Sequence, residues 1–538
     1  MSATQGFDYI IVGAGAAGCV IANRLSADPA VRVALIEAGP SDLRFPVNVK
    51  TTLPVGNIFL LPHARYNWRH QFSGGPGVNG RMIACPRGKL VGGCTSINGT
   101  VYIRGHRIDY EEWAALGNQG WAYDDVLPVY KRHENHAAGA SAWHGAGGEL
   151  DVQRPADNHV LAHAFVAAGV EAGYSRNEDF NGAQQDGFGI FDLNQRGGVR
   201  LSSSRAFLHP VLHRPNLRLF TDALVERVNL RGTRATGITV RREGRREDLT
   251  ASADVIIAAG TVNSPQLLML SGIGPQAALA RHGIEVAHAM PGVGANLQDH
   301  PTVSLATTNP GAESYALTWR AAPRVALAPL RYLFGHRGML ASNAAEAGSF
   351  IRSRPGLERP DVQMTFMVGL KESARTLPRR HGFVVHLSVL RAATRGHLEL
   401  ASADPAACPL MHPAFLDERA DVETLARSLR EARRVFSMPA LARYAGEEIA
   451  PGSAVTDDDQ IEAFIRASLG TTYHPVGTCK MGPARDPMAV VDARLKVHGI
   501  EGLRVADASI MPNLIGGNTA APSMMIGERA AAFIYAPA

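Results

Sequence analysis

The N-terminal segment restricts the fold more than any other part of the chain. Residues 7–12 form an apolar run typical of a buried strand, and a Gly-x-Gly-x-x-Gly turn follows at 13–18. A helical pattern over 16–25 and a second apolar strand over 31–36 complete a βαβ unit. In such units the glycines permit a tight turn, close approach of a pyrophosphate, and close packing of helix on strand. The sequence therefore predicts a Rossmann-like dinucleotide-binding domain.

The nature of the dinucleotide depends on two further features. Glu37 ends the second strand, where a carboxylate can bind the adenosine ribose hydroxyls and disfavours a 2′-phosphate. This argues against NADP and leaves NAD and FAD open. A second glycine-rich stretch, residues 87–99, is too elaborate for a simple loop and offers the extra backbone contacts that a ribityl chain and a wide tricyclic ring need. These residues favour FAD.

Composition excludes several classes of protein. The 538 residues are 46% hydrophobic, which rules out a mainly disordered chain. The net charge of +5 is spread without a dense basic block, so we expect no nucleic-acid partner. The five cysteines form no C-x-x-C pair, so we expect no metal site. The polar start of the chain has no signal-peptide pattern, and no apolar run reaches membrane-spanning length, which predicts a soluble cytoplasmic protein.

One segment leaves an alternative open. Residues 316–334 are apolar but interrupted by arginines and prolines. They are interpreted as a lid or core segment, with a peripheral membrane contact as the alternative.

The rest of the chain predicts an α/β (α+β overall) protein of two domains. Alternating residues between 217 and 260 predict antiparallel strands that return into a parallel one. From residue 303 the pattern changes to strands and amphipathic helices, and the last 70 or so residues resume the first style. We expect an FAD-binding domain assembled from residues 1–155, 195–302 and 468–538. A substrate domain on an antiparallel sheet with helices, residues 156–194 and 303–467, is inserted between these segments.

Five ordered blocks make the chain resemble the glucose–methanol–choline (GMC) oxidoreductases, which are FAD enzymes. The likeness spans nearly the whole chain and is nearest to bacterial choline-dehydrogenase-like and alcohol dehydrogenases. The blocks are residues 87–105, 260–274, 292–300, 473–482 and 504–509.

The resemblance implies a set of cofactor contacts. Members with a covalently linked flavin carry a histidine just before Asn98; here that residue is Ile97, which implies non-covalent FAD. Cys94 replaces a residue that is usually Gly, Ser or Thr and is interpreted as tolerated. The predicted cofactor-binding residues are Gly13, Gly15, Ala16, Ala17, Gly18, Glu37, Ala38, Arg87, Gly88, Gly92, Gly93, Asn98, Gly99, Thr100, Val101, Val225, Ala259, Gly260, Asp507, Ala508 and Thr519.

The chemistry of alcohol oxidation points to two catalytic residues. A hydride must leave carbon and a proton must leave oxygen, and histidine is the natural base near neutral pH. His474 lies in the block where the family places this base. Asn518 occupies the position of its family partner, where an amide can hydrogen-bond the substrate oxygen without competing for the proton.

Other candidate residues are less specific. We expect His300 to fix a loop at a domain boundary, and Glu346 either to border the substrate cavity or to form a structural ion pair. Met364, Phe366 and Leu387 alternate on predicted strands, where core packing is the default and pocket lining the alternative.

The preferred function is oxidation of a primary alcohol to the aldehyde, with electrons passed to a quinone or other acceptor. The alternatives are an oxygen-using alcohol oxidase, a flavin-containing hydroxynitrile lyase and a flavin-binding protein without catalysis. A neutral alcohol is preferred over choline, whose cation needs an aromatic or anionic cage that the sequence does not reveal.

Overall fold

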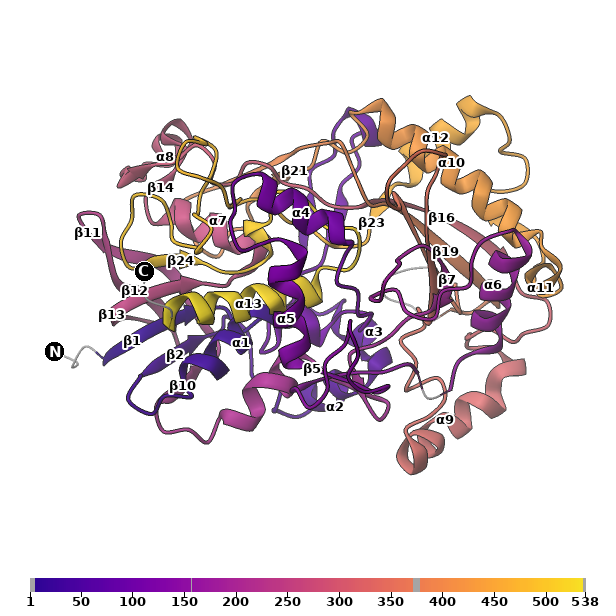
Figure 1. Cartoon of the computed structure of the whole chain (residues 1–538), viewed down its shortest axis with the longest axis horizontal. Helices are drawn as coiled ribbons and strands as arrows, with labels where there is room; N and C mark the ends of the chain where they lie inside the picture. The colour runs from indigo at the N-terminus through magenta and orange to yellow at the C-terminus, as the bar shows by residue number, and fades with distance from the viewer. Residues whose placement is uncertain (1–4, 156, 371–377, 536–538) are drawn as a thin grey trace.

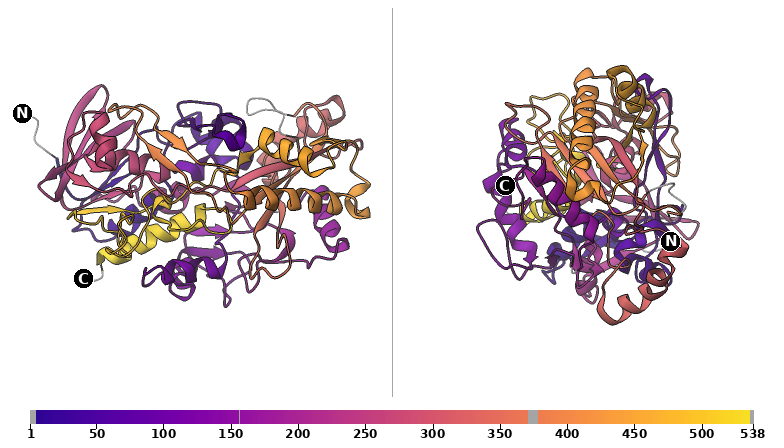
Figure 2. Two further views of the ribbon diagram at one scale, coloured as in Figure 1. Left: turned by 90° about the horizontal axis from the view of Figure 1, so that it is seen from above. Right: turned by 90° about the vertical axis from the view of Figure 1, so that its right-hand side faces the viewer.

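The computed structural model describes residues 5–155, 157–370 and 378–535. The polar residues 1–4 and the first residue of the predicted substrate domain, 156, lie outside the described residues. The described chain forms an elongated molecule with a seven-stranded sheet near each end (Figures 1 and 2). The described chain begins with β1 and ends with α13, and both elements lie toward the end that carries the first sheet. The mixed α/β architecture with an antiparallel second sheet confirms the predicted fold class.

The first sheet contains the predicted βαβ unit. Strands β1 and β2 are parallel and flank α1, and β11, β12 and β13 form the predicted antiparallel meander that returns into a parallel strand. The sheet consists, in spatial order, of β10 (Leu217–Phe220), β2 (Val33–Ile36), β1 (Gln5–Val12), β13 (Arg245–Ile257), β12 (Arg234–Arg242) and β11 (Ala223–Arg231), with β24 (Leu503–Val505) beside β13.

Two helices cover the first sheet near its glycine-rich turn. Helix α1 (Ala16–Leu25) packs against the C-terminal helix α13 (Ala520–Tyr535), shown in yellow in Figure 1. The fully buried carboxylate of Glu528 on α13 pairs with Arg24 on α1 at 2.7 Å and with Arg132 at 2.7 Å. Burial alone would raise the pKa of Glu528, but His133 and Arg24 beside it lower that pKa to about 2. The last helix is thereby fastened to the first one.

The second sheet is antiparallel and has two different faces. Helices α6 (Val160–Glu171) and α10 (Arg419–Phe436) cover one face, where Phe165 stacks on Phe366 with ring centroids 4.7 Å apart. The strands, in order, are β22 (Glu448–Ala450), β16 (Pro301–Thr308), β19 (Gly382–Val389), β18 (Val362–Met367), β17 (Ala347–Ile351) and β7 (Gly187–Ile190), with β23 (Gly470–Thr471) beside β16.

The predicted domain ranges differ slightly from the membership of the sheets. Residues 301–302 and β23 belong to the second sheet, although the predicted ranges place them in the FAD-binding domain. Residues 301–302 pair with residues 470–471 because β16 begins directly at the junction between the two predicted domains. The domain boundaries themselves remain a prediction.

The segments between residues 40 and 150 contain the helices α4 (Arg107–Ala115) and α5 (Tyr123–His133) and several shorter helices. Strands β3 and β4 of this part form a small four-stranded sheet with β20 and β21. The remaining elements are α2 (Val47–Thr52), α3 (Asn57–Leu60), β3 (His70–Phe72), β4 (Ile83–Cys85), β5 (Glu134–His136), β6 (Leu150–Val152), β8 (Gln195–Arg196), β9 (Val199–Arg200), α7 (Gly260–Leu270), β14 (Ile273–Gly274), α8 (Gln276–Arg281), β15 (His288–Ala289), β20 (His397–Glu399), β21 (Leu410–His412), α11 (Pro439–Ala442) and α12 (Asp458–Ser468).

The ambiguous segment over residues 316–334 forms a surface helix. Helix α9 (Ala322–Gly335) projects from the lower right of the molecule in Figure 1, and only Ala328 and Tyr332 are buried in it. The core interpretation of this segment is therefore wrong. Within the described ranges, the model contains no helix with the length and apolar character required to span a bilayer.

Candidate active site

A single cavity of about 900 Å³ connects the glycine-rich turn with the second sheet. It is lined by most of the positions predicted from the sequence, although these come from segments far apart in the chain. The predicted residues in the lining are Gly13, Gly15, Ala16, Ala17, Glu37, Ala38, Arg87, Gly88, Gly93, Asn98, Gly99, Thr100, Val101, Val225, Ala259, Gly260, Asp507, Ala508 and Thr519, together with His474 and Asn518.

The three glycines of the turn have different surroundings. Gly13 has a φ of +107°, and a Cβ there would lie 2.4 Å from the carbonyl oxygen of Ala258. At Gly18 a Cβ would lie 1.9 Å from the oxygen of Gly13, so this residue serves helix packing and does not line the cavity. A Cβ at Gly15 would meet nothing within 4 Å. Gly15 thus keeps the N-terminus of α1 open to the cavity, as a bound pyrophosphate requires.

Glu37 is nearly buried at the end of β2 and fixes the same turn. Its carboxylate accepts hydrogen bonds from the backbone N–H groups of Ala14 (3.1 Å) and Gly39 (2.9 Å). Burial raises the pKa of Glu37 to about 7 despite these bonds. Because Glu37 also lines the cavity, its position is compatible with the predicted contact to an adenosine ribose.

Two predicted residues act mainly within the protein. Gly92 has a φ of +88° and does not line the cavity; its N–H donates to Ala14 at 2.7 Å, which joins the two glycine-rich segments. The carboxylate of Asp507 accepts hydrogen bonds from the N–H of Gly260 (2.9 Å) and the hydroxyl of Ser264 (2.6 Å). Asp507 therefore anchors the start of α7 at the cavity wall. The open glycine turn and the length of the cavity fit an extended dinucleotide such as FAD.

His474 lies at the other end of the cavity, just after β23. Tyr473, the residue before it, has a φ of +66°, in the left-handed region that non-glycine residues rarely adopt. This backbone is held by Arg87, which donates to the carbonyl of Tyr473 at 2.5 Å, and by Asp299, which accepts from the N–H of His474 at 2.9 Å. The surrounding structure thus fixes an otherwise unfavourable conformation that presents the imidazole to the cavity.

A chain of hydrogen bonds determines which nitrogen of His474 carries the proton. His300 Nε2 lies 3.1 Å from the carbonyl oxygen of Ile515, which can only accept, so neutral His300 is protonated at Nε2. His300 Nδ1 is then an acceptor, and it lies 3.1 Å from His474 Nδ1, which donates to it. The hydroxyl oxygen of Thr472 lies 3.0 Å from the same nitrogen and can also accept from it. The Nε2 atom of neutral His474 is therefore unprotonated.

The same chain continues through two amides. Asn518 Nδ2 lies 3.2 Å from His474 Nε2 and donates to it, while Gln363 Nε2 donates to Asn518 Oδ1 at 3.3 Å. Because an unprotonated Nε2 of His474 needs a donor, the Asn518 amide turns its N–H groups to the imidazole and its oxygen to Gln363. This arrangement presents a proton acceptor and a hydrogen-bond donor side by side in the cavity.

The electrostatics of this cluster keep His474 neutral. Burial, together with His300 and Arg87, holds the pKa of His474 well below its usual value. Burial and Arg391 lower the pKa of His300 to about 3. Burial also raises the pKa of Asp299 to about 6, despite its hydrogen bonds to Thr471 and His474. At neutral pH the imidazole of His474 is therefore in the form that can accept a proton.

Profiles of the GMC oxidoreductase family match residues 7–302 and 392–527 of the chain. Together these ranges contain the glycine turn, His300, His474 and Asn518. The chain belongs to the GMC oxidoreductases. It is accordingly an FAD-dependent enzyme of the class that oxidises CH–OH donors.

Curated GMC relatives share the full length of the chain. An alcohol dehydrogenase (acceptor) of Pseudomonas putida is 43% identical over 98% of this chain and 95% of that protein. The mitochondrial choline dehydrogenase of Mus musculus is 43% identical over 98% and 89%. An oxygen-dependent choline dehydrogenase of Sinorhizobium medicae is 42% identical over 97% and 94%.

Solved structures show the same fold. A pyridoxine 4-oxidase from Mesorbium loti superposes with a TM-score of 0.87 at 30% identity, covering 98% of both chains. A formate oxidase gives a TM-score of 0.91 over 99% of both chains at 24% identity, a likeness of fold alone.

In this GMC enzyme the substrate end of the cavity lies against the second sheet. Met364, Phe366 and Leu387 point to the helix-covered face and are fully buried, which confirms the core interpretation and excludes pocket lining. The cavity is instead lined by their neighbours Thr365 and Met367 on β18 and His386 on β19. The predicted alternation is correct. One face of each strand packs against the helices, and the other face lines the cavity.

Two candidates from the sequence have structural partners of their own. Glu346 is fully buried, accepts from the hydroxyl of Ser342 at 2.5 Å and from the N–H of His159 at 2.7 Å, and does not line the cavity. His300 does more than fix a loop, because it is a direct partner of His474. His300 directly follows Asp299, so two residues that contact His474 are neighbours in the sequence.

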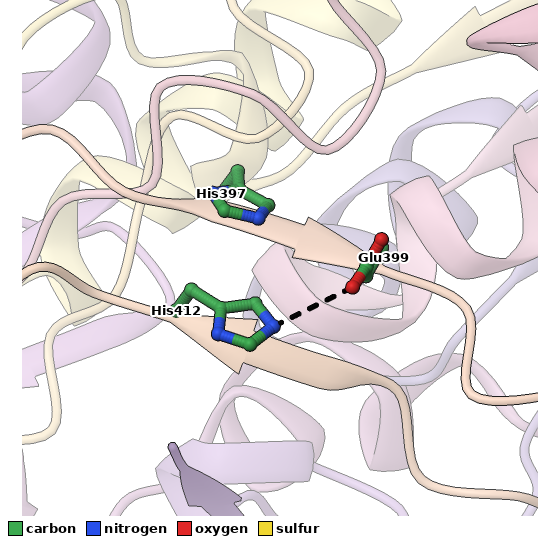
Figure 3. Close-up of side chains that lie close together, drawn as sticks. All are labelled: His397, Glu399 and His412. Atoms are coloured by element: carbon green, nitrogen blue, oxygen red, sulfur yellow. Dashed lines mark ion pairs between the residues drawn. The ribbon is translucent and has the colours of Figure 1, made fainter. Parts of the chain in front are cut away.

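A second group of histidines lies apart from the catalytic cluster. His397, Glu399 and His412 share one face of the β20–β21 hairpin, close enough together for a metal ion (Figure 3). None of the three lines the cavity. Glu399 is already engaged by Arg281 at 2.8 Å and lies 3.6 Å from His412, so these contacts account for the group as an ion-pair network that ties α8 to the hairpin.

Proposed function

We propose that this GMC oxidoreductase oxidises a neutral primary alcohol to the aldehyde, with His474 as the general base and a quinone or similar molecule as electron acceptor. The observation that carries the proposal is the position of His474, which lines the same cavity as the glycine turn and whose Nδ1 contact with His300 leaves Nε2 to accept a proton. The two-electron oxidation is chemistry that FAD supplies when bound there, as a hydride acceptor. The residues that would hold it non-covalently are those of the glycine turn, the 87–101 segment and Asp507 to Ala508.

The chain's own residues handle the proton of the alcohol. With an alcohol bound, its hydroxyl would replace the Asn518 N–H at Nε2 of His474 and give its proton to that nitrogen, while Asn518 donates an N–H to the alcohol oxygen. The electron pair left on the oxygen then assists departure of a hydride from the neighbouring carbon. Asn518 can do this because its oxygen is occupied by Gln363. Proton removal by a positioned base contributes typically about 10²–10⁴ in rate.

The lining of the substrate end favours an uncharged substrate. Thr302, Ser304, Thr365, Met367 and Leu370 line this end of the cavity. Among the described lining residues the only carboxylates are Glu37 and Asp507, and both lie at the cofactor end, already bonded to backbone N–H groups. A quaternary ammonium group needs an aromatic or anionic cage. The lining offers the aromatic side chains of Phe59, Trp68, Tyr315 and Tyr473, but no described carboxylate lines the cavity beside them to balance a cation.

The test is anaerobic reduction of the FAD-loaded enzyme by a matched pair of alcohols. The pair is choline and its uncharged isostere, in which carbon replaces the nitrogen. We expect the isostere to bleach the flavin at least ten-fold faster than choline at equal concentration. Faster bleaching by choline would refute the neutral substrate, and bleaching by neither, nor by a range of other primary alcohols, would refute alcohol oxidation.

The acceptor is tested on the same preparation. We expect the reduced enzyme to be reoxidised rapidly by a short-chain quinone and slowly by oxygen. Rapid reoxidation by oxygen with stoichiometric peroxide would make the protein an oxidase and overturn this part of the proposal.

A further inference from the structure

Helix α9 presents its apolar side outward. Side-chain exposure reaches 72% at Leu333 and 86% at Phe334, and Leu327 and Leu330 are about half exposed. Trp319, just before the helix, is 83% exposed. A surface helix of a globular protein normally turns its apolar stripe to the core. This stripe therefore faces away from the protein and has no covering element among the described residues.

The arrangement around the helix axis is that of an interfacial helix. Leu327, Leu330 and Phe334 fall within an arc of about 60° at 3.6 residues per turn, opposite the buried Ala328 and Tyr332. Arg324 and Arg331 fall at the boundary of the two faces on the same wheel. An apolar stripe bordered by arginines is the pattern of a helix that lies in a membrane surface.

The charge around the helix has one sign. Residues 314–345 contain Arg320, Arg324, Arg331 and Arg337, all exposed, and no Asp or Glu. Arg320 and Arg324 donate to backbone carbonyls, of Pro310 at 3.1 Å and of Glu313 at 2.7 Å. Across residues 5–155, 157–370 and 378–535, no carboxylate lies within ion-pair distance of any of the four arginines. Their charge is left to attract an anionic surface.

The segments that flank α9 on both sides reach the cavity. Tyr315 and Leu317 precede the helix, Met339 follows it, and all three line the cavity near its substrate end. Leu317 is also 43% exposed, so it belongs to both the outer surface and the cavity. A surface bound through α9 would therefore lie next to an entrance of the cavity.

We propose that α9 and Trp319 dock this enzyme on an anionic lipid bilayer, so that an apolar acceptor or alcohol passes between the lipid and the cavity. The identity of the molecule that passes into the cavity rests on the proposed function, whereas the binding to lipid does not. The four arginines favour lipid headgroups over an apolar protein surface as the occupant. A second copy of the chain would bring these like charges together, which disfavours a dimer through this face.

The experiment is co-sedimentation of the FAD-loaded full-length protein with vesicles. One set consists of phosphatidylcholine alone and the other contains about a third phosphatidylserine. We expect binding to the anionic set only, weakened by high salt because arginine–headgroup attraction is screened. Failure to bind anionic vesicles at low salt would overturn the proposal.

Two variants and a matched control locate the contact. Leu330→Ser combined with Phe334→Ser, and separately Arg324→Gln with Arg331→Gln, are each expected to reduce vesicle binding at least ten-fold. Leu116→Ser is the control, because Leu116 is 48% exposed against 51% for Leu330 and follows α4, on the opposite side of the molecule (Figure 1). Equal binding by the control and the α9 variants would also overturn the proposal.

Two further readouts separate the alternatives. Activity with alcohol and a water-soluble dye acceptor is expected to stay unchanged in the α9 variants, since none of these residues lines the cavity. Loss of a dimer in the leucine–phenylalanine variant, without vesicle binding by the wild type, would assign the face to a second copy and refute the lipid. Vesicle binding by an enzyme that no alcohol reduces would leave the docking intact and refute only the proposed function.

Discussion

The two ends of the cavity are built in different ways. The cofactor end is made largely of backbone from short glycine-rich segments, and residues such as Gly13 and Gly15 specify each segment locally. The catalytic end is made of side chains that approach one another from four separate segments, around Asp299, Gln363, His474 and Asn518. A local motif can therefore secure cofactor binding, whereas catalysis depends on the long-range fold.

The largest effect is expected when the catalytic end loses its base. His474→Ala should keep bound FAD, because the glycine turn lies at the other end, but should slow anaerobic flavin reduction by about 10²–10⁴-fold. Stopped-flow bleaching with a primary alcohol measures this rate. Undiminished reduction would show that His474 is not the base.

A substitution at the cofactor end should instead weaken FAD binding while His474 stays in place. Gly15→Val adds a side chain where nothing of the protein lies within 4 Å, so the fold should persist while FAD binding weakens roughly ten- to hundred-fold. Titration of the apoprotein with FAD measures the affinity. Gly18→Ala is the contrasting variant, since its Cβ would meet the oxygen of Gly13 at 1.9 Å and should lower thermal stability as well. Unchanged FAD affinity in Gly15→Val would refute the assigned pyrophosphate site.

His300 is expected to act as a positioning residue. His300→Ala removes the acceptor that fixes the tautomer of His474, and a misplaced base should cost roughly ten- to hundred-fold in kcat. Since His300 also lowers the pKa of His474, the acid limb of the pH profile should move to higher pH. His300→Gln, which keeps an acceptor, should recover part of the rate. A loss of kcat without movement of the limb would indicate a structural role only.

The smallest expected effect is a pH-dependent change in the free energy of unfolding when Asp299 is replaced. Burial raises its pKa to about 6 in the folded protein from an ordinary value of 3.8, so its contribution to stability is fully present below pH 3.8 and is lost as pH rises through 6. Asp299→Asn should therefore gain up to about 3 kcal/mol relative to wild type near pH 7 and lose this advantage near pH 4. Thermal melts across this range measure the difference, and a pH-independent difference would contradict it.

The same contrast explains what could be predicted from the sequence. The strand, glycine turn, helix and Glu37 follow one another along the chain, so the βαβ unit and its place in the cavity could be inferred directly. His474 and Asn518 were found through the family resemblance. Their partners His300 and Gln363 were not assigned these roles, because their proximity arises only when the second sheet forms beside the first.

Periodicity predicted strands but not the faces that they present. Met364, Phe366 and Leu387 are apolar and alternate, yet they pack under α6 and α10, while Thr365 and His386 line the cavity. Both faces of these strands are covered, one by helices and one by the cavity, so the apolar pattern alone could not distinguish them. Helix α9 is the converse case, where apolar residues lie outside.

The contacts between α13 and α1 hold the first and last helices of the chain together, so that the two helices move as one. Asn518 lies two residues before α13 begins, and Glu528 fastens that helix to Arg24. A change that weakens the contact between α13 and α1 would displace the Asn518 amide and the glycine turn together. Engineering that alters substrate choice is therefore better directed at the second sheet, and fusions at the C-terminus should leave residues 518–535 untouched.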